Sequence, residues 1–218
     1  MRARFASVVF DVDSTLSAIE GIDWLAEHRG ADVARACAAL TAQAMSGDVA
    51  IEDVYLKRLQ AIAPTAAELG ALAEAYLNTV QPGAPQVIAA LHDADVEVHL
   101  VSGGLHDAIL PLAFDLGIPV DRVHAVHIAA DASGRLVELD GVQPLATQRG
   151  KPLVVSQLGL ARPSVMIGDG ATDAAARGVV DEFIAYTGVA RRDAVVAVAD
   201  AEASDFLSLH RLLFLAPR

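Results

Sequence analysis

The stretch ASVVFDVDST, residues 6–15, decides the fold. Its first half, Ala6–Phe10, is a short β-branched and aromatic run without helical periodicity, which predicts a buried strand. Two acidic residues, Asp11 and Asp13, follow directly on that strand. Open α/β sheets bind their ligands beyond the carboxyl ends of the strands, so carboxylates at this position indicate a functional site.

The chain beyond residue 84 alternates between helix and strand patterns. Helices are expected over 85–94, 105–116 and 152–158, from residue 172, and near 205–213, and strands over 96–101, 164–167 and 182–186. Residues 126–129 and 135–139 flank a turn sequence and predict a small β-hairpin. Helices that alternate with buried strands predict an α/β fold with a Rossmann-like, mainly parallel sheet.

Residues 21–78 have a different character. Ala, Glu, Arg and Leu dominate this stretch, no strand pattern occurs, and Leu69, Leu72 and Tyr76 follow a helical spacing. We therefore predict a helical cap, residues 17–78, inserted into an α/β core domain made of residues 1–16 and 79–218.

Composition excludes several classes of protein. The 218 residues are 54% hydrophobic, the opposite of a disordered chain. No run of 18 apolar residues lacks a charge, so no membrane-spanning helix is expected. Sixteen basic against 28 acidic residues give a net charge of −12 without a basic stripe, which disfavours nucleic acid as a partner. Cys37 is the only cysteine, which fits a small buried filler and a cytoplasmic location.

Polar residues follow three of the predicted strands, at Asp11–Thr15, Ser102–Gly104 and Gly168–Asp173. If these strands are neighbours, four aspartates meet in one cleft, and such close carboxylates need a compensating cation. Oxygen ligands favour Mg²⁺, and the glycines let backbone N–H groups approach an anion. Lys151, between a glycine and a proline, is the candidate for a neutralising positive charge. The combination predicts phosphoryl transfer.

The segments 11–15, 102, 151 and 168–173, in that order, resemble the four motifs of the haloacid dehalogenase superfamily. Within it the chain resembles the phosphoserine phosphatase family. Six segments carry this further similarity: 10–16, 20–23, 58–59, 82–83, 101–104 and 167–173. The resemblance implies an Mg²⁺-dependent phosphoric monoester hydrolase that converts O-phosphoserine to serine and phosphate in serine biosynthesis, as a monomer or homodimer.

The same resemblance implies roles for the catalytic and metal-binding residues. Asp11 is expected to attack phosphorus and form an aspartyl-phosphate. Asp13 is expected to protonate the departing oxygen and then to activate water. Mg²⁺ would bind to the Asp11 carboxylate, the Asp13 carbonyl and Asp169, with Asp173 beside it. Lys151 would neutralise phosphate or nucleophile charge.

Five residues are expected to bind the substrate. Ser102 and Gly103 would hold phosphate oxygens, and Thr172 matches the form of the last motif found in eukaryotic relatives. By resemblance, Glu20 would bind the substrate's α-amino group and Arg58 its carboxylate, where a guanidinium can donate two parallel hydrogen bonds.

The sequence also departs from the family pattern, and alternatives remain. Relatives carry Met-Gly-Gly and then a phenylalanine where this chain has Met45, Ser46, Gly47 and Ile51. The alternatives are another small phosphomonoester, phosphoryl transfer to homoserine, or a non-catalytic regulatory protein, although that last class would be expected to lack Asp11 or Asp13.

Two further features of the sequence, a pair of histidines and an apolar C-terminal segment, are not expected to have a function of their own. His124 and His127 are three residues apart, but no further ligand is evident, so no zinc site is expected there. Residues 212–215 are apolar, and a docked terminal helix accounts for them.

Overall fold

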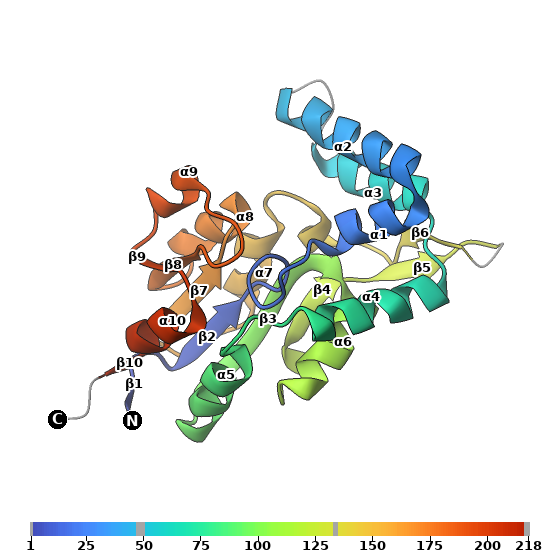
Figure 1. The fold of residues 1–218 in the computed structure, drawn as a ribbon. Coiled ribbons are helices and arrows are strands. Elements are labelled where there is room, and N and C mark those ends of the chain that lie inside the picture. Colours follow the sequence, from blue (N-terminus) through green and yellow to red (C-terminus); the bar gives the residue numbers. More distant parts are fainter. Residues whose placement is uncertain (1, 47–50, 133–134, 216–218) are drawn as a thin grey trace.

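The first predicted strand lies in the middle of a parallel sheet. The structure, a computed structural model, describes residues 2–46, 51–132 and 135–215. Its six-stranded sheet has the order β4-β3-β2-β7-β8-β9, and every neighbouring pair is parallel (Figure 1). The strands are β2 (Ser7–Phe10), β3 (Glu97–Leu105), β4 (Val123–Val126), β7 (Ser164–Gly168), β8 (Glu182–Tyr186) and β9 (Ala201–Ala203). The predicted α/β class is confirmed.

Helices cover both faces of the sheet because alternate strand residues point to opposite sides. Val8 and Phe10 belong to one apolar cluster, which includes residues of α5 (Ala84–Asp93), α6 (His106–Asp115) and α10 (Phe206–Leu213). Val9 belongs to a second cluster on the other face, with residues of α7 (Gly150–Gln157) and α9 (Asp193–Val196). The full burial of all four β2 residues follows from this double cover.

Residues 21–78, which were predicted to be helical, contain four helices in the part that the structure describes. They are α1 (Gly21–Arg29), α2 (Ala31–Ser46), α3 (Ile51–Ile62) and α4 (Ala66–Asn78). Helices α1, α2 and α3 contact one another and lie together at one side of the molecule, whereas α4 packs against α6 (Figure 1). Buried Leu69, Leu72 and Tyr76 form the inner face of α4, which confirms their predicted helical spacing.

The hairpin differs from the prediction. Residues 123–130 contain two strands, because Val126 ends β4 in the main sheet and His127 separates it from β5 (Ile128–Ala130). β5 pairs antiparallel with β6 (Leu136–Leu139), and β6 contacts α3. The predicted strand over 126–129 merged these two elements because both are apolar.

Short elements complete the chain. β1 (Arg2–Ala3) pairs antiparallel with β10 (Phe214–Leu215), which places the two ends of the described chain side by side (Figure 1). The predicted terminal helix docks through buried Leu209 and Leu213. After Asp169, α8 (Ala171–Ala174) is a single turn that continues as a 3₁₀ helix. Within the described ranges no helix combines the length and apolar character needed to cross a bilayer.

Candidate active site

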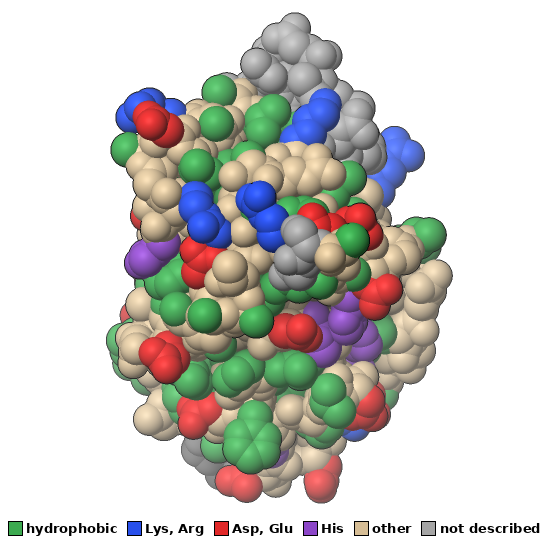
Figure 2. Space-filling view, turned by 90° about the vertical axis from the view of Figure 1, so that its right-hand side faces the viewer, with side chains coloured by type: hydrophobic (Ala, Val, Ile, Leu, Met, Phe, Trp, Pro, Cys, Tyr) green, Lys and Arg blue, Asp and Glu red, His purple; other side chains and the backbone are tan. Residues whose placement is uncertain are grey.

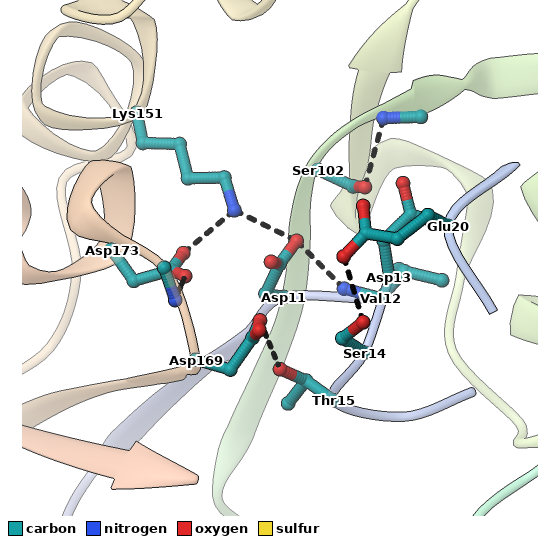
Figure 3. A network of polar contacts seen from close by, with 12 residues as sticks. Asp11, Val12, Asp13, Ser14, Thr15, Glu20, Ser102, Lys151, Asp169 and Asp173 are labelled. Atoms are coloured by element: carbon teal, nitrogen blue, oxygen red, sulfur yellow. Dashed lines mark hydrogen bonds and ion pairs between the residues drawn. The ribbon is translucent and has the colours of Figure 1, made fainter. Parts of the chain in front are cut away.

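Three neighbouring strands, β3, β2 and β7, deliver the predicted motifs to one edge of the sheet. Asp11 follows β2, Ser102 lies near the end of β3, and Asp169 follows β7. Figure 3 shows these side chains converging, with Lys151 and Asp173 on one side and Glu20 on the other. Oxygen atoms of Asp11, Asp169 and Asp173 lie within 4.8 Å of one another, and all three residues are buried. The predicted gathering of aspartates is present.

Lys151 bridges two of these carboxylates. Its Nζ lies 2.8 Å from Asp11 Oδ1 and 2.6 Å from Asp173 Oδ1, and it extends from the first turn of α7. Burial, and then the negative charge of Asp11, raise the pKa of Asp173 to about 7, while Lys151 lowers it. The two carboxylates raise the pKa of Lys151 against the opposing effect of burial. Lys151 therefore remains charged and neutralises a buried acidic pair.

Only one oxygen of the Asp11 carboxylate, Oδ1, forms a hydrogen bond or ion pair with other described residues. Oδ1 accepts a hydrogen bond from the Val12 N–H at 2.8 Å in addition to the Lys151 contact. Among the described residues no hydrogen-bond donor reaches Oδ2. Asp11 also lines a pocket, so this second oxygen is available to a ligand.

Asp13 has different surroundings. Its Oδ1 accepts hydrogen bonds from the Tyr76 hydroxyl at 2.6 Å and from the Gly21 N–H at 3.2 Å. Burial is the main cause that raises the pKa of Asp13 to about 8, followed by the charges of Glu20 and Asp11. A carboxylic acid that keeps its proton near neutral pH can act as a general acid. Gly21 is required at this contact, because a Cβ there would lie 2.1 Å from the Tyr76 oxygen.

The loop after Asp13 turns sharply. Ser14 adopts a φ of 51°, a conformation that is uncommon for residues other than glycine. Its hydroxyl donates a 2.7 Å hydrogen bond to Glu20, and the Thr15 hydroxyl donates one of 3.3 Å to Asp169. Burial raises the pKa of Glu20. The strained turn thus places Glu20 at the edge of the site, opposite Lys151 (Figure 3).

The end of β3 contributes a backbone lining. The fully buried Ser102 Oγ accepts a 3.0 Å hydrogen bond from the Gly104 N–H. Gly103 lines the pocket, and its carbonyl accepts a 2.9 Å hydrogen bond from the Tyr55 hydroxyl. Tyr55 belongs to α3, so this bond joins the helical segment to the end of a core strand.

Asp169 is paired with an arginine, Arg192, that no sequence motif indicates. Arg192, at the start of α9, forms an ion pair with Asp169 Oδ2 and donates a 3.2 Å hydrogen bond to the Asp169 carbonyl. It also lies 3.7 Å from Glu20. A guanidinium at this place is consistent with a carboxylate cluster that attracts cations.

A pocket of about 280 Å³ lies over these groups. The predicted residues that line it are Asp11, Asp13, Glu20, Arg58, Gly103, Lys151 and Thr172. Ser102, Asp169 and Asp173 are buried and are not part of its lining. Arg58 reaches it from α3 and forms an ion pair with Asp23, which also lines the pocket. The side chains of Met45, Ser46, Gly47 and Ile51 lie outside the described residues.

Comparison with known proteins agrees with this geometry. The sequence profile of the haloacid dehalogenase-like hydrolases matches residues 8–177. The chain belongs to this family. This hydrolase is 38% identical to the chloroplastic phosphoserine phosphatase of Arabidopsis thaliana over 199 aligned residues. The alignment covers 89% of this chain and 67% of that protein. It is 34% identical over 206 residues to the phosphoserine phosphatase of Bos taurus, covering 93% and 91% of the two proteins.

A solved structure shares the same fold. The phosphoserine phosphohydrolase-like protein of Francisella tularensis superposes on this hydrolase with a TM-score of 0.80 at 25% identity, over 98% of this chain and 100% of the other. The family membership and the parallel-sheet architecture predicted from the sequence are therefore confirmed.

Proposed function

We propose that this hydrolase is a phosphoserine phosphatase that uses Mg²⁺ and an aspartyl-phosphate on Asp11. The observation that carries the proposal is the contrast between two acids in one pocket. Asp11 is paired with Lys151, whereas burial raises the pKa of Asp13 to about 8. One carboxylate suited to attack and one carboxyl suited to protonate are what a two-step phosphomonoester hydrolysis requires.

The chemistry follows from these positions. In the first step an Asp11 oxygen bonds to phosphorus, the ester P–O bond breaks, and the Asp13 proton passes to the leaving serine oxygen. In the second step Asp13 accepts a proton from water, whose oxygen bonds to phosphorus as the bond to Asp11 breaks and phosphate forms. Lys151, Ser102 and Gly103 would hold the phosphate oxygens through both steps.

The carboxylate cluster fits a magnesium ion. Asp11, Asp169 and Asp173 offer only oxygen ligands, which Mg²⁺ prefers, and their atoms lie within 4.8 Å of one another. When bound, the ion would neutralise charge on the phosphate. The Asp13 carbonyl is the fourth protein ligand that we propose.

The substrate proposal rests on two charged groups at the outer part of the pocket. Glu20 would accept the ammonium group of serine, and Arg58 would donate to its carboxylate. Arg192 lies between Glu20 and Asp169, close enough to take part in substrate binding. The relatives named phosphoserine phosphatase support this assignment, in which the product is serine and the pathway is serine biosynthesis.

The division of the chain into a core and a cap is also our inference. The proposed cap, residues 17–78, supplies six residues of the site, and the core, residues 1–16 and 79–218, supplies the others. The six are Glu20, Gly21, Asp23, Tyr55, Arg58 and Tyr76. The mutual packing of α1, α2 and α3 supports a separate unit, and the contact of α4 with α6 anchors it to the core.

A panel of phosphomonoesters tests the substrate. With Mg²⁺ present, O-phosphoserine should release phosphate faster than phosphoethanolamine, which lacks the carboxylate, and 3-phosphooxypropionate, which lacks the amine. Arg58→Ala should raise KM for O-phosphoserine about tenfold or more, the value of a charge-assisted hydrogen bond, and should change phosphoethanolamine hydrolysis little. Arg35→Ala, on the exposed surface of α2, is the matched control.

Three outcomes would count against the proposal. Equal rates on all three esters would remove the substrate assignment, and phosphohomoserine formation on addition of homoserine would identify a phosphotransferase. Turnover by Asp11→Asn would remove the aspartyl-phosphate.

A further inference from the structure

Histidine side chains gather on one face of the molecule, with acidic side chains beside them (Figure 2). Two pairs of histidine rings lie close together in the structure. The rings of His99 and His124 lie 5.6 Å apart, and those of His106 and His127 lie 4.0 Å apart. The second pair lies outside the active-site pocket described above.

The fold supplies His127 with partners that its sequence neighbours do not. His106 and Asp107 form the first turn of α6, and His127 occupies the single-residue link between β4 and β5. One nitrogen from each histidine and one carboxylate oxygen lie within 4.8 Å of one another, and His106 Nδ1 is 3.2 Å from Asp107 Oδ1. In the sequence, the histidine near His127 is His124, three residues before it, and His106 and Asp107 are too distant along the chain to be recognised as further ligands.

We propose that His106, Asp107 and His127 bind a divalent transition-metal ion such as Zn²⁺. Two imidazoles and a carboxylate are typical ligands of this class of ion, whereas Mg²⁺ prefers oxygen. In a tetrahedral zinc site the ligand atoms lie about 3.4 Å apart. His106 Nδ1 and Asp107 Oδ1 lie close to that separation, at 3.2 Å, and a nitrogen of His127 lies within 4.8 Å of the ligand atoms of the other two residues.

The exposure of this cluster favours metal binding over a purely structural contact between the rings of His106 and His127. Asp107 and His127 are exposed, so an ion and a completing water molecule can reach the site.

The position gives the bound ion a structural effect. His106 lies two residues after Gly104, at the end of the strand that carries the proposed phosphate-binding residues. His127 directly precedes β5, whose partner β6 contacts α3. A metal bridge would therefore fix the β3–α6 junction to the base of the hairpin that supports the cap.

Zinc titration tests the proposal. Calorimetry with the full chain, in excess Mg²⁺ to occupy the carboxylate cluster, should give one Zn²⁺ site in the wild type. His127→Ala and, independently, Asp107→Asn should weaken Zn²⁺ binding at least about tenfold, because even the loss of outer-shell partners costs that much. His28→Ala is the matched control, since His28 is also exposed and stacks on an aromatic ring, that of Trp24.

The outcomes separate this site from the catalytic cluster. Zn²⁺ should raise the Tm of the wild type and of His28→Ala, but not that of His127→Ala. Wild-type affinity in both His127→Ala and Asp107→Asn would overturn the proposal. Zinc binding that disappears only in Asp169→Asn would assign the ion to the active site and overturn it as well. Phosphatase activity is not part of this test, so its failure leaves the proposed function unaffected.

Discussion

Removal of Lys151 should destabilise the protein in a way that depends on pH and magnesium. Lys151→Met keeps the length of the side chain and deletes a charge that contacts Asp11 and Asp173, whose side chains are 8% and 0% exposed. Removing one partner of a buried charge pair costs about 3–5 kcal/mol. A folded protein has ~5–15 kcal/mol of stability in total, so the variant should fold with a much smaller margin.

Protonation of Asp173 limits the loss of stability in Lys151→Met at pH 6. The pKa of Asp173 is about 7 with Lys151 present, far above its usual value of 3.8, and it rises further without the lysine. At pH 6 the variant can therefore keep Asp173 neutral, and its loss should lie near the lower end, about 3 kcal/mol. Because the raised folded-state pKa belongs to an acid, stability falls as pH increases toward that pKa, at up to ~1.4 kcal/mol per pH unit.

Urea unfolding between pH 6 and pH 8, with a chelator present, measures the effect. Lys57→Met is the matched control, since Lys57 is the only other lysine and is exposed. Magnesium should reduce the difference between Lys151→Met and the wild type, because a cation among the carboxylates replaces part of the missing charge. A loss below about 1 kcal/mol that does not change with pH would refute the reasoning.

Three further predictions concern single residues. Tyr76→Phe removes the hydroxyl bonded to Asp13 and should lower kcat about tenfold, with the folded state retained and KM little changed. Gly150→Ala should destabilise the fold by about 3 kcal/mol or more in thermal or urea unfolding, because its Cβ would lie 1.9 Å from the Pro144 carbonyl oxygen. His99→Asn should make the protein less sensitive to acid. As the pH is lowered from 6.5 to 4, the free energy of unfolding of the wild type should fall by about 1–3 kcal/mol more than that of the variant, a range that allows for solvent screening. The cause is the pKa of His99, lowered from 6.5 to about 4, so that only the unfolded chain takes up a proton in this range.

Two of these variants have matched controls. Tyr186→Phe removes another buried phenol, one that bonds to Gln81 away from the pocket, and should leave kcat unchanged. Gly70→Ala introduces a Cβ into open space on α4 and should not destabilise. An equal kcat for Tyr76→Phe and wild type, or the same acid sensitivity in His99→Asn and wild type, would contradict the corresponding prediction.

Most of the fold was predictable because each element has a local pattern. Strands such as Ser7–Phe10 and Glu182–Tyr186 are short apolar runs, and the helices carry apolar stripes. The strand-tip rule then predicted that residues as distant as Asp11 and Asp169 would meet. Strands β1, β9 and β10 were missed because two or three residues are too few to show a period.

The missed site residues have contacts that local patterns do not contain. Tyr76 was recognised only as part of an apolar helix face, although a buried phenol normally requires a hydrogen-bond partner, and this was a usable signal. The sequence contains no comparable signal for the contacts of Tyr55 and Arg192. Tyr55 reaches Gly103 only through the packing of α3 on the core, and Arg192 reaches Asp169 only because α9 begins beside β7.

The central position of β2 has a consequence for how the chain folds. Residues 7–10 pair with residues 97–100 on one side and with residues 164–167 on the other. During synthesis from the N-terminus this fully buried strand emerges before both of its partners, whereas the helical segment that follows it contains mostly local contacts. We therefore expect slow folding, with an early intermediate in which the helices have formed while β2 is unpaired and prone to self-association.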